Sequence, residues 1–514
     1  MANWEIIVLS LYVASSFCLA VYGSHCYLMI FLFLKRQKKS RNKIQESIDN
    51  YILNQKEETY PYVTIQLPFY NEKSVVERVM LSAAEVDYPK DKFEIQILDD
   101  SNDETVDIVN RIIETIRSQG INISVIRRHD RKDYKAGALA NGMTICKGEF
   151  IAIFDADFIV PKSFLKRAIP LITAQDDVAC VQGRWGHINS QENWLTKAQS
   201  VGIDGHFAAE QGARSYYGMC LNFNGTGGVW RKSAILAGGG WQGDTLTEDL
   251  DLSYRVQMEG YRIVYDFDNV CLAEIPNDVI ALKSQQKRWA KGSMQTAIKL
   301  APRIIKSKRL AWYEKIEAML HMTHYSVAIF MTIVCTLTFP VLGIAENLKV
   351  EMNYLLYIVW SFILISALAP CAMYTGSGIV LGKWKKSIRT FPAMMVLGTG
   401  LCVNNALAVL EAFTKKKTAF VRTPKSGSTD VSKKKSLYQA NTPLLFCLIE
   451  LTLGIYAFAT LYKYTYASTH IFGLFILSYA IGMTCFGYIT LRYKAFYWFS
   501  RNSKQLQAAT SKLE

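Results

Sequence analysis

Residues 6–34 are the feature that most limits how this chain can fold, because they contain no Asp, Glu, Lys or Arg. A transmembrane helix needs about 20 mainly apolar residues, so this stretch is long enough to cross a bilayer. Comparable stretches follow at 322–345, 353–375, 443–463 and 470–491. The sequence therefore predicts an integral, multi-pass membrane protein with an α-helical transmembrane region.

The basic residues predict how these spans are oriented. The formal net charge is +14, and Lys and Arg cluster beside the apolar stretches, as is typical of cytoplasmic loops. Residues 391–413 form a further apolar stretch between two basic loops, but it contains two Asn residues and a Glu. We expect this segment to lie in the interface or to re-enter rather than cross. That leaves five crossings, with residues 35–320 in the cytosol.

The positive charge does not indicate a nucleic-acid partner. The sequence has neither an aromatic ribonucleoprotein box nor a paired Cys/His finger. Its 11 cysteines are scattered without a C-x-x-C pair, which favours reduced packing residues over metal or redox chemistry. We therefore expect a lipid bilayer, and no nucleic acid, among the partners; protein partners are unknown.

Residues 61–300 have the pattern of a soluble α/β domain. Helix-like stretches such as 103–119 and 134–147 alternate with β-rich runs at 63–69, 94–100, 123–128, 150–157 and 178–185. This alternation is typical of a parallel sheet, in which ligands bind beyond the carboxyl ends of the strands. We expect a cytosolic linker at 35–60 before this domain and an interfacial helix at 301–320 after it.

Three acidic segments of this domain could carry chemistry, and each has a structural alternative. Asp155 and Asp157 follow a buried strand, where carboxylate oxygens suit Mg²⁺ or Mn²⁺ and a diphosphate can complete the shell. Asp99 and Asp100 could equally form a turn or a helix cap. Thr247-Glu248-Asp249 could be an N-cap followed by acids that favour the helix dipole.

The segment "QQKRW" at 285–289 adds an amide, a guanidinium and an indole within five residues. Trp289 could stack on a sugar face and Arg288 could bind phosphate, although the segment could also be an ordinary helix surface. Two isolated residues stay open: His206 could touch an acceptor or be structural, and Glu450, inside an apolar span, could line a polar pathway or bond to another helix.

Taken in order, D-D, D-x-D, T-E-D and Q-x-x-R-W resemble the signature of processive family-2 glycosyltransferases, the group of cellulose, hyaluronan and chitin synthases. The segments "PFYNE", "KAGALANG", "FNGTGGVWRKSAI" and "GGWQGDTLTEDLDL" are most similar to the cellulose-synthase-like A and C branch of glucomannan and β-glucan synthases and their bacterial relatives. In the membrane region, 321–514, "AFVRTPKSG" is similar to a gating loop, placed at 414–440. The resemblance implies an α/β, GT-A-type (Rossmann-like) cytosolic domain.

The resemblance also implies roles for individual residues. Asp249, with Glu248 beside it, would be the catalytic base, and Asp155 and Asp157 would hold the cation. The donor would be bound by Pro68, Tyr70, Glu72, Asp99, Lys135, Asp155, Arg288 and Thr423. The acceptor would be bound by Trp289, Gln285, Asn224 and Thr226. A carboxylate with an ordinary pKa near 3.9 is a weak base at neutral pH, so we expect positioning to carry the proton transfer.

The expected activity is that of a hexosyltransferase that inverts the donor sugar from α to β and passes a β-linked polysaccharide through its own membrane helices. We favour UDP-glucose as nucleotide sugar donor, a polysaccharide acceptor, and a β-1,4 or β-1,3 glucan as product. The alternatives are a GDP-mannose-dependent mannan or glucomannan synthase, a non-processive lipid glycosyltransferase, and a transporter whose soluble domain only binds a nucleotide. The expected location is a plasma or Golgi-type membrane.

Overall fold

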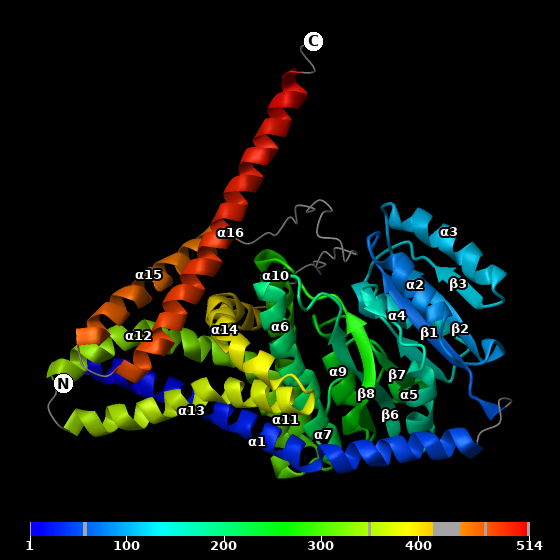
Figure 1. Cartoon of the computed structure of the whole chain (residues 1–514), viewed down its shortest axis with the longest axis horizontal. Coiled ribbons are helices and arrows are strands. Elements are labelled where there is room, and N and C mark those ends of the chain that lie inside the picture. Colours follow the sequence, from blue (N-terminus) through cyan, green and yellow to red (C-terminus); the bar gives the residue numbers. More distant parts are fainter. Residues whose placement is uncertain (1, 55–58, 348–350, 415–442, 467–469, 511–514) are drawn as a thin grey trace.

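A sheet-containing domain and a group of long helices make up the molecule (Figure 1). The computed structural model describes residues 2–54, 59–347, 351–414, 443–466 and 470–510. Helix α1 (Asn3–Asn54) runs along both parts and packs against the membrane-type helices as well as the sheet domain. The two parts are therefore joined along the length of one helix.

Within the described residues the sheet has the strand order β3-β2-β1-β4-β7-β6-β8-β5. The strands are β1 (Val63–Phe69), β2 (Phe93–Asp99), β3 (Asn122–Ile126), β4 (Phe150–Ile153), β5 (Phe158–Ile159), β6 (Val178–His187), β7 (Gly228–Arg231) and β8 (Arg262–Ala273). β1 is parallel to β2 and β4, but β7 is antiparallel to both of its neighbours and β5 is antiparallel to β8. The predicted α/β fold is confirmed, while the expectation of a wholly parallel sheet is wrong: the sheet is mixed.

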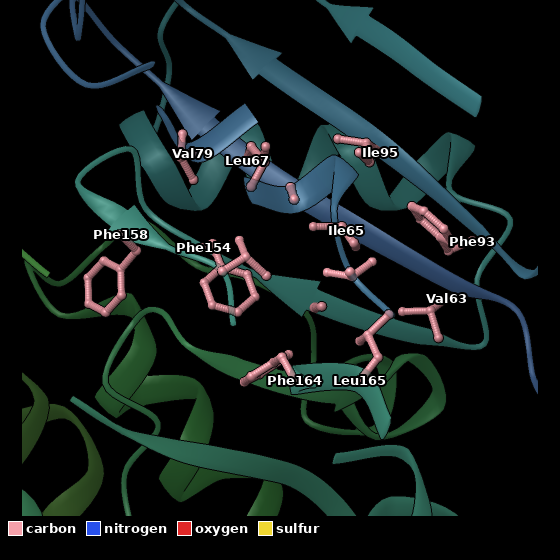
Figure 2. Close-up of a cluster of buried hydrophobic side chains, with 14 of the residues drawn as sticks. Val63, Ile65, Leu67, Val79, Phe93, Ile95, Phe154, Phe158, Phe164 and Leu165 are labelled. Atoms are coloured by element: carbon pink, nitrogen blue, oxygen red, sulfur yellow. The ribbon is translucent and has the colours of Figure 1, made fainter. Parts of the chain in front are cut away.

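The first half of the sheet is covered on both faces, which explains why its strands read as continuous apolar runs. Every residue of β2 and β4 is buried, and so are six of the seven in β1. Figure 2 shows one side of this core, where Val63, Ile65 and Leu67 lie in one cluster with Phe154 and Phe164. This packing fixes the strand ends that carry the predicted acids.

Helices cover the two faces of the sheet. They are α2 (Val76–Ala84), α3 (Thr105–Ser118), α4 (Tyr134–Ile145), α5 (Phe164–Thr173), α6 (Trp194–Asp204), α7 (Gln211–Tyr216), α8 (Lys232–Ala237) and α9 (Glu248–Met258), with short η2 (Lys90–Lys92) and a π-helix, η3 (Gly205–Glu210). α3 and α4 coincide closely with the stretches expected at 103–119 and 134–147.

The remaining helices form the other part of the molecule. They are α10 (Val279–Lys306), α11 (Trp312–Thr323), η4 (His324–Ser326), α12 (Val327–Asn347), α13 (Glu351–Val380), α14 (Trp384–Ala412), α15 (Leu444–Tyr466) and α16 (His470–Thr510). The helix expected at 301–320 is instead the end of α10 and the start of α11, separated near Ser307. Thr423 and the expected gating loop fall outside the described residues apart from position 414.

Six helical segments of the described chain are long and apolar enough to span a membrane: five correspond to the predicted spans, and the sixth is α14. More of the apolar stretch of α14 is buried inside the protein than of any other segment of the six. Length and composition alone therefore allow α14 to cross. That it lies in the interface, and that the chain crosses five times, stay predictions.

The segment expected to be a linker at 35–60 is helical up to Asn54. Arg41 forms two hydrogen bonds to Asp268, of 2.9 and 2.6 Å, and the ring of Phe33 stacks on Tyr216 with the centroids 6.3 Å apart. Ile48 is buried in the apolar core of the sheet domain. These contacts hold α1 against that domain, so its charged second half is part of the scaffold.

Candidate active site

A cavity of about 180 Å³ opens at the carboxyl ends of β1 and β4 and gathers most of the predicted site residues. Those that line it are Pro68, Tyr70, Glu72, Lys135, Asp155, Asp157, Asn224, Glu248, Asp249, Gln285, Arg288 and Trp289. They come from segments spread over more than two hundred residues of sequence. The fold thus brings the four separated motifs to a single place.

Lys135 lies at the centre of the acidic groups. Its Nζ donates hydrogen bonds to Asp155 Oδ1 at 2.5 Å and to the carbonyl of Gly225 at 2.8 Å. Burial favours the neutral amine, but Asp155, Glu248 and Asp249 outweigh it and raise the pKa of Lys135. The ammonium group therefore stays charged and offers a fixed cation to a negatively charged ligand.

Gly225 separates this cation from the acid of the T-E-D motif. It has a φ of +78°, and a Cβ at this position would lie 2.9 Å from Asp249 Oδ2. Only glycine combines this conformation with such a close approach. The "FNGT" turn therefore needs its glycine to hold Lys135 and Asp249 side by side.

Asp249 occupies the first turn of α9 and accepts a hydrogen bond of 2.8 Å from the backbone N–H of Leu250. Burial, and then the neighbouring Glu248, raise its pKa to about 7, although Lys135 and Arg288 act in the opposite direction. The expectation of an ordinary acidic pKa is therefore wrong. A carboxylate that titrates near neutrality is matched to general-base catalysis at physiological pH.

The start of α9 is fixed against α10. Thr247 occupies the N-cap position but makes no side-chain capping bond; its hydroxyl lies 3.1 Å from that of Thr296 instead. A Cβ at Gly292 would lie 2.6 Å from Thr247 Cγ2, so the two helices touch here. The side chain of Thr247 therefore does not cap α9, as the structural alternative for the T-E-D motif would require.

Helix α10 carries the Q-x-x-R-W motif and is tied to the membrane-type helices by two lysines. Lys283 Nζ lies 2.7 Å from both carboxylate oxygens of Glu450 on α15, and Lys287 Nζ lies 2.6 Å from Glu411 on α14. Of the two alternatives for Glu450, a polar pathway or a bond to another helix, the structure shows the bond to another helix. Trp289 faces the cavity, 6.5 Å from the ring of Trp185.

Asn224 joins the cavity to a buried polar network. Its Oδ1 accepts hydrogen bonds from Gln211 at 3.1 Å and Asn222 at 2.9 Å. Its Nδ2 is buried and has no hydrogen-bond partner within the described chain. An unpaired buried donor costs free energy, so this amide is suited to a hydroxyl or carbonyl oxygen brought by a ligand. His206 lies in the same network, 2.7 Å from Glu210, as a structural histidine would.

The residues present fit a hard divalent cation only together with a ligand. Asp155 and Asp157 supply carboxylate oxygens, the ligand type that Mg²⁺ and Mn²⁺ prefer. No group of three or more His, Cys, Asp or Glu side chains that could hold a metal occurs in the described part of the chain. A diphosphate would have to complete the coordination.

Three predicted residues are not among those lining the cavity. Asp99 is buried and accepts a hydrogen bond of 2.9 Å from Arg127, whereas Asp100 lines the cavity. Thr226 is buried behind the site, where its hydroxyl accepts a 2.9 Å hydrogen bond from the backbone N–H of Asp155. Thr423 lies outside the described residues. Their proposed roles stay predictions.

Other cavity residues were missed by sequence reasoning, among them Arg131, Tyr134, Trp185, His187 and Glu274. Trp185 lies at the end of β6 and stacks on Phe207 with the centroids 4.5 Å apart. Its position follows from the register of β6 with β8, which no local pattern shows. Only the rule that ligands bind at strand ends could have pointed to it.

The mixed sheet and its acid-lined cavity define a GT-A-type domain. The model of the family described as Glycosyl transferase family 2 matches residues 64–235, and that of Glycosyl transferase family group 2 matches residues 150–376. The chain belongs to the family-2 glycosyltransferases, of the cellulose-synthase-like type. The resemblance seen in the sequence motifs is thereby confirmed.

Among similar proteins, glucomannan 4-beta-mannosyltransferase 1 of Oryza sativa subsp. japonica is 37% identical over 264 residues, covering 51% of each chain. Glucomannan 4-beta-mannosyltransferase 2 of Arabidopsis thaliana is 35% identical over 303 residues, covering 58% of this chain and 56% of that one. The chain thus spans about half the length of these curated relatives. A solved structure, mannosyltransferase PcManGT from Pyrobaculum calidifontis with GDP-Man and Mn²⁺, is 19% identical with a TM-score of 0.43, covering 72% of this chain and 99% of that one.

Proposed function

We propose that this chain is a membrane-embedded, inverting hexosyltransferase that extends a β-linked polysaccharide from a nucleotide sugar. The observation that carries the proposal is the convergence of Lys135, Asp155, Asp249 and Trp289 on one cavity. The same cavity offers a fixed cation, a carboxylate that titrates near neutrality and an aromatic ring, which are the groups that glycosyl transfer from a diphosphate needs.

The reaction assigns each of these groups a task. An acceptor hydroxyl oxygen attacks the anomeric carbon of the donor on the face opposite the diphosphate. The new C–O bond forms as the bond to the diphosphate oxygen breaks, and the anomeric centre inverts from α to β. Asp249 takes the hydroxyl proton; base catalysis of this kind contributes about 10²–10⁴-fold.

The leaving diphosphate meets positive charge on this chain from Lys135 and Arg288. A divalent cation, when bound, would add Lewis-acid stabilisation of the leaving group, and Asp155 and Asp157 would hold it. Trp289 would stack on the acceptor sugar, and the amide N–H of Asn224, which has no partner in the described part of the chain, would bind one of the sugar's oxygens.

The donor we propose is GDP-mannose. The relatives' names, glucomannan 4-beta-mannosyltransferase, favour this alternative over the UDP-glucose expected from the sequence, and they favour a β-1,4 linkage. The expected product is therefore a β-1,4-linked mannan or glucomannan. The catalytic domain would face the cytosol, where nucleotide sugars are made, and the membrane would be of plasma or Golgi type.

A second cavity supports passage of the product through the membrane helices. It measures about 280 Å³ between α1, α12, α13, α14, α15 and α16, and none of its described lining residues is charged. Tyr374 and Met394 line it, and Ile203 on α6 lines the catalytic cavity. On either side of Ile203, a Cβ at Gly202 would lie 2.8 Å from Met394, and a Cβ at Gly205 would lie 2.8 Å from Tyr374. One short segment therefore separates the two cavities.

The proposal is tested by incubating the purified full chain with Mg²⁺ or Mn²⁺ and either GDP-mannose or UDP-glucose. We expect release of GDP and a glycan whose methylation analysis shows 4-linked mannose. A single sugar extractable with lipid would instead support a non-processive lipid glycosyltransferase. Nucleotide binding without any donor turnover would support a transporter.

A further inference from the structure

Three planar side chains lie together at one wall of the catalytic cavity. The guanidinium carbon of Arg131 is 3.1 Å from the centroid of the Tyr70 ring and 5.5 Å from that of Tyr134. All three residues line the cavity. Tyr70 follows β1, and the other two lie around the start of α4, so the wall joins two elements of the sheet domain. Stacking on Tyr70 holds the guanidinium flat and leaves its in-plane N–H donors available.

The backbone around this group is strained in a way that fixes it. Within the described chain, the residues other than glycine with positive φ are Asn71 at 55°, Asp133 at 57° and Tyr134 at 46°. Asn and Asp tolerate this region, but for an aromatic residue such as Tyr134 it is sterically unfavourable. All three positions lie in or directly beside the planar group. Strain of this kind gathers at ligand-binding positions, where it holds side chains in a preset geometry.

The neighbouring arginines are paired with carboxylates, whereas Arg131 has no such pairing among the described residues. Arg127 bonds to Asp99 at 2.9 Å, and Arg128 bonds to both oxygens of Asp100 at 3.0 and 2.5 Å. For Arg131, the described chain provides no hydrogen bond or ion pair to the guanidinium, and its Nε is buried without a partner. A guanidinium that is held in place but unpaired has unused capacity for a ligand.

The cations of the site are also divided between two places. Lys135 and Arg288 act on Asp249, at the acidic end where the diphosphate would lie. Arg131 is held instead against the aromatic ring that follows β1. A nucleotide with its phosphates at the acidic end would bring its base toward this wall.

We propose that Arg131 reads the base of the nucleotide donor and selects guanine over uracil. This inference rests on the proposed function, because it assumes that a nucleoside diphosphate occupies the cavity. Guanine presents two adjacent acceptors, O6 and N7, that match two parallel N–H donors of a guanidinium. An edge of uracil presents one carbonyl beside an N–H donor or a C–H, so it can take only one such bond. A matched bidentate pair corresponds to a preference of about 5- to 150-fold.

The test measures dissociation constants of nucleoside diphosphates for the full chain in detergent by calorimetry. We expect GDP and IDP, which share O6 and N7, to bind with similar affinity and more tightly than UDP and ADP. 7-Deaza-GDP, which lacks only the N7 acceptor, should bind more weakly than GDP. These comparisons use the wild-type protein, so they remain valid if a variant fails to fold.

Two substitutions complete the test. Arg131→Met and Arg131→Lys both remove the bidentate N–H donor of the guanidinium, and the Lys variant keeps the positive charge. Each variant should bring GDP affinity close to UDP affinity while leaving UDP affinity largely unchanged. Arg111→Met is the matched control, since the Arg111 side chain is 67% exposed on α3. Thermal melting of each variant reports whether it is folded.

Several results would overturn the inference. Equal losses of GDP and UDP affinity in Arg131→Met would mean that Arg131 binds the diphosphate rather than the base. Equal wild-type affinity for GDP, 7-deaza-GDP and ADP would mean that the base is not read. Binding of UDP in preference to GDP would refute guanine selection but leave a nucleotide-dependent transferase intact. Binding of none of these nucleotides would overturn the proposed function together with the inference.

Discussion

The pH dependence of turnover should report the ionisation of Asp249. Burial and Glu248 raise its pKa to about 7 from an ordinary value of 3.8. The base must be ionised to accept the proton, so kcat/KM should fall by about tenfold per pH unit below pH 7. An aspartate with an ordinary pKa would keep full activity down to about pH 5. At pH 6, kcat/KM relative to its maximum therefore differs by about tenfold between the two cases.

The substitution Glu248→Gln tests whether the Glu248 carboxylate, rather than another acidic group, raises the pKa of Asp249. Glu248 raises the pKa of Asp249, so removing its charge should move the acidic limb of the profile to lower pH. A shift of about one pH unit would correspond to ~1.4 kcal/mol of interaction between the two carboxylates. The measurement is the initial rate of GDP release at low donor concentration between pH 5 and 8. A wild-type rate that shows no acidic limb between pH 5 and 8, or an acidic limb that Glu248→Gln leaves in place, would refute the reasoning.

Three further predictions address the membrane part and the cation. Lys283→Met should lower the free energy of unfolding by about 3–5 kcal/mol, because it leaves the Glu450 carboxylate buried without its cation. Thermal melting should show that the double variant Lys283→Met, Glu450→Met recovers stability. Gly398→Phe should shorten the glycan without slowing the first transfer, because a Cβ at Gly398 meets no atom of the described residues within 4 Å and the Phe side chain would fill the membrane cavity. Ile455→Phe, at a 65% exposed position, is the control. Full-length product from Gly398→Phe would argue against passage through this cavity. Chelation of divalent cations should abolish transfer and Mn²⁺ or Mg²⁺ should restore it, whereas undiminished turnover in chelator would remove the proposed role of Asp155 and Asp157.

The sequence predicted the first half of the sheet well because its strands are buried on both faces. Runs such as 63–69 leave little choice of structure, and β1 (Val63–Phe69) has those same bounds. The antiparallel strands were harder, since β5 has two residues and β7 has four. Their direction depends on pairing with β8, β4 and β6, which are distant in the chain. A wholly parallel sheet was the natural but incorrect expectation.

The second half of α1 shows a different limit. Its many charges suggested a linker, yet Ile44, Ile48 and Tyr51 recur on one helical face and pack on the core of the sheet domain. The length of this helix follows from a surface provided by residues far along the chain. Local composition could not reveal that surface.

The site was predictable in its acids and its Q-x-x-R-W motif but not in its electrostatics. Each motif could be found by residue type, whereas the raised pKa of Asp249 depends on burial and on Glu248, whose effects exceed the opposing effect of Lys135. Arg131 could not be distinguished by sequence from Arg127 and Arg128. What distinguishes it is that the structure pairs its two neighbours with carboxylates and leaves it against Tyr70.

The most direct test of a single glycosyl-transfer site is the variant Asp249→Asn, assayed in parallel for turnover and for nucleotide binding. With GDP-mannose and a divalent cation, GDP release and polymer formation should fall by about 10²–10⁴-fold, while the dissociation constant for GDP stays close to that of the wild type. Polymer formation by Asp249→Asn at the wild-type rate would contradict the assignment of the base and with it the mechanism built on this cavity.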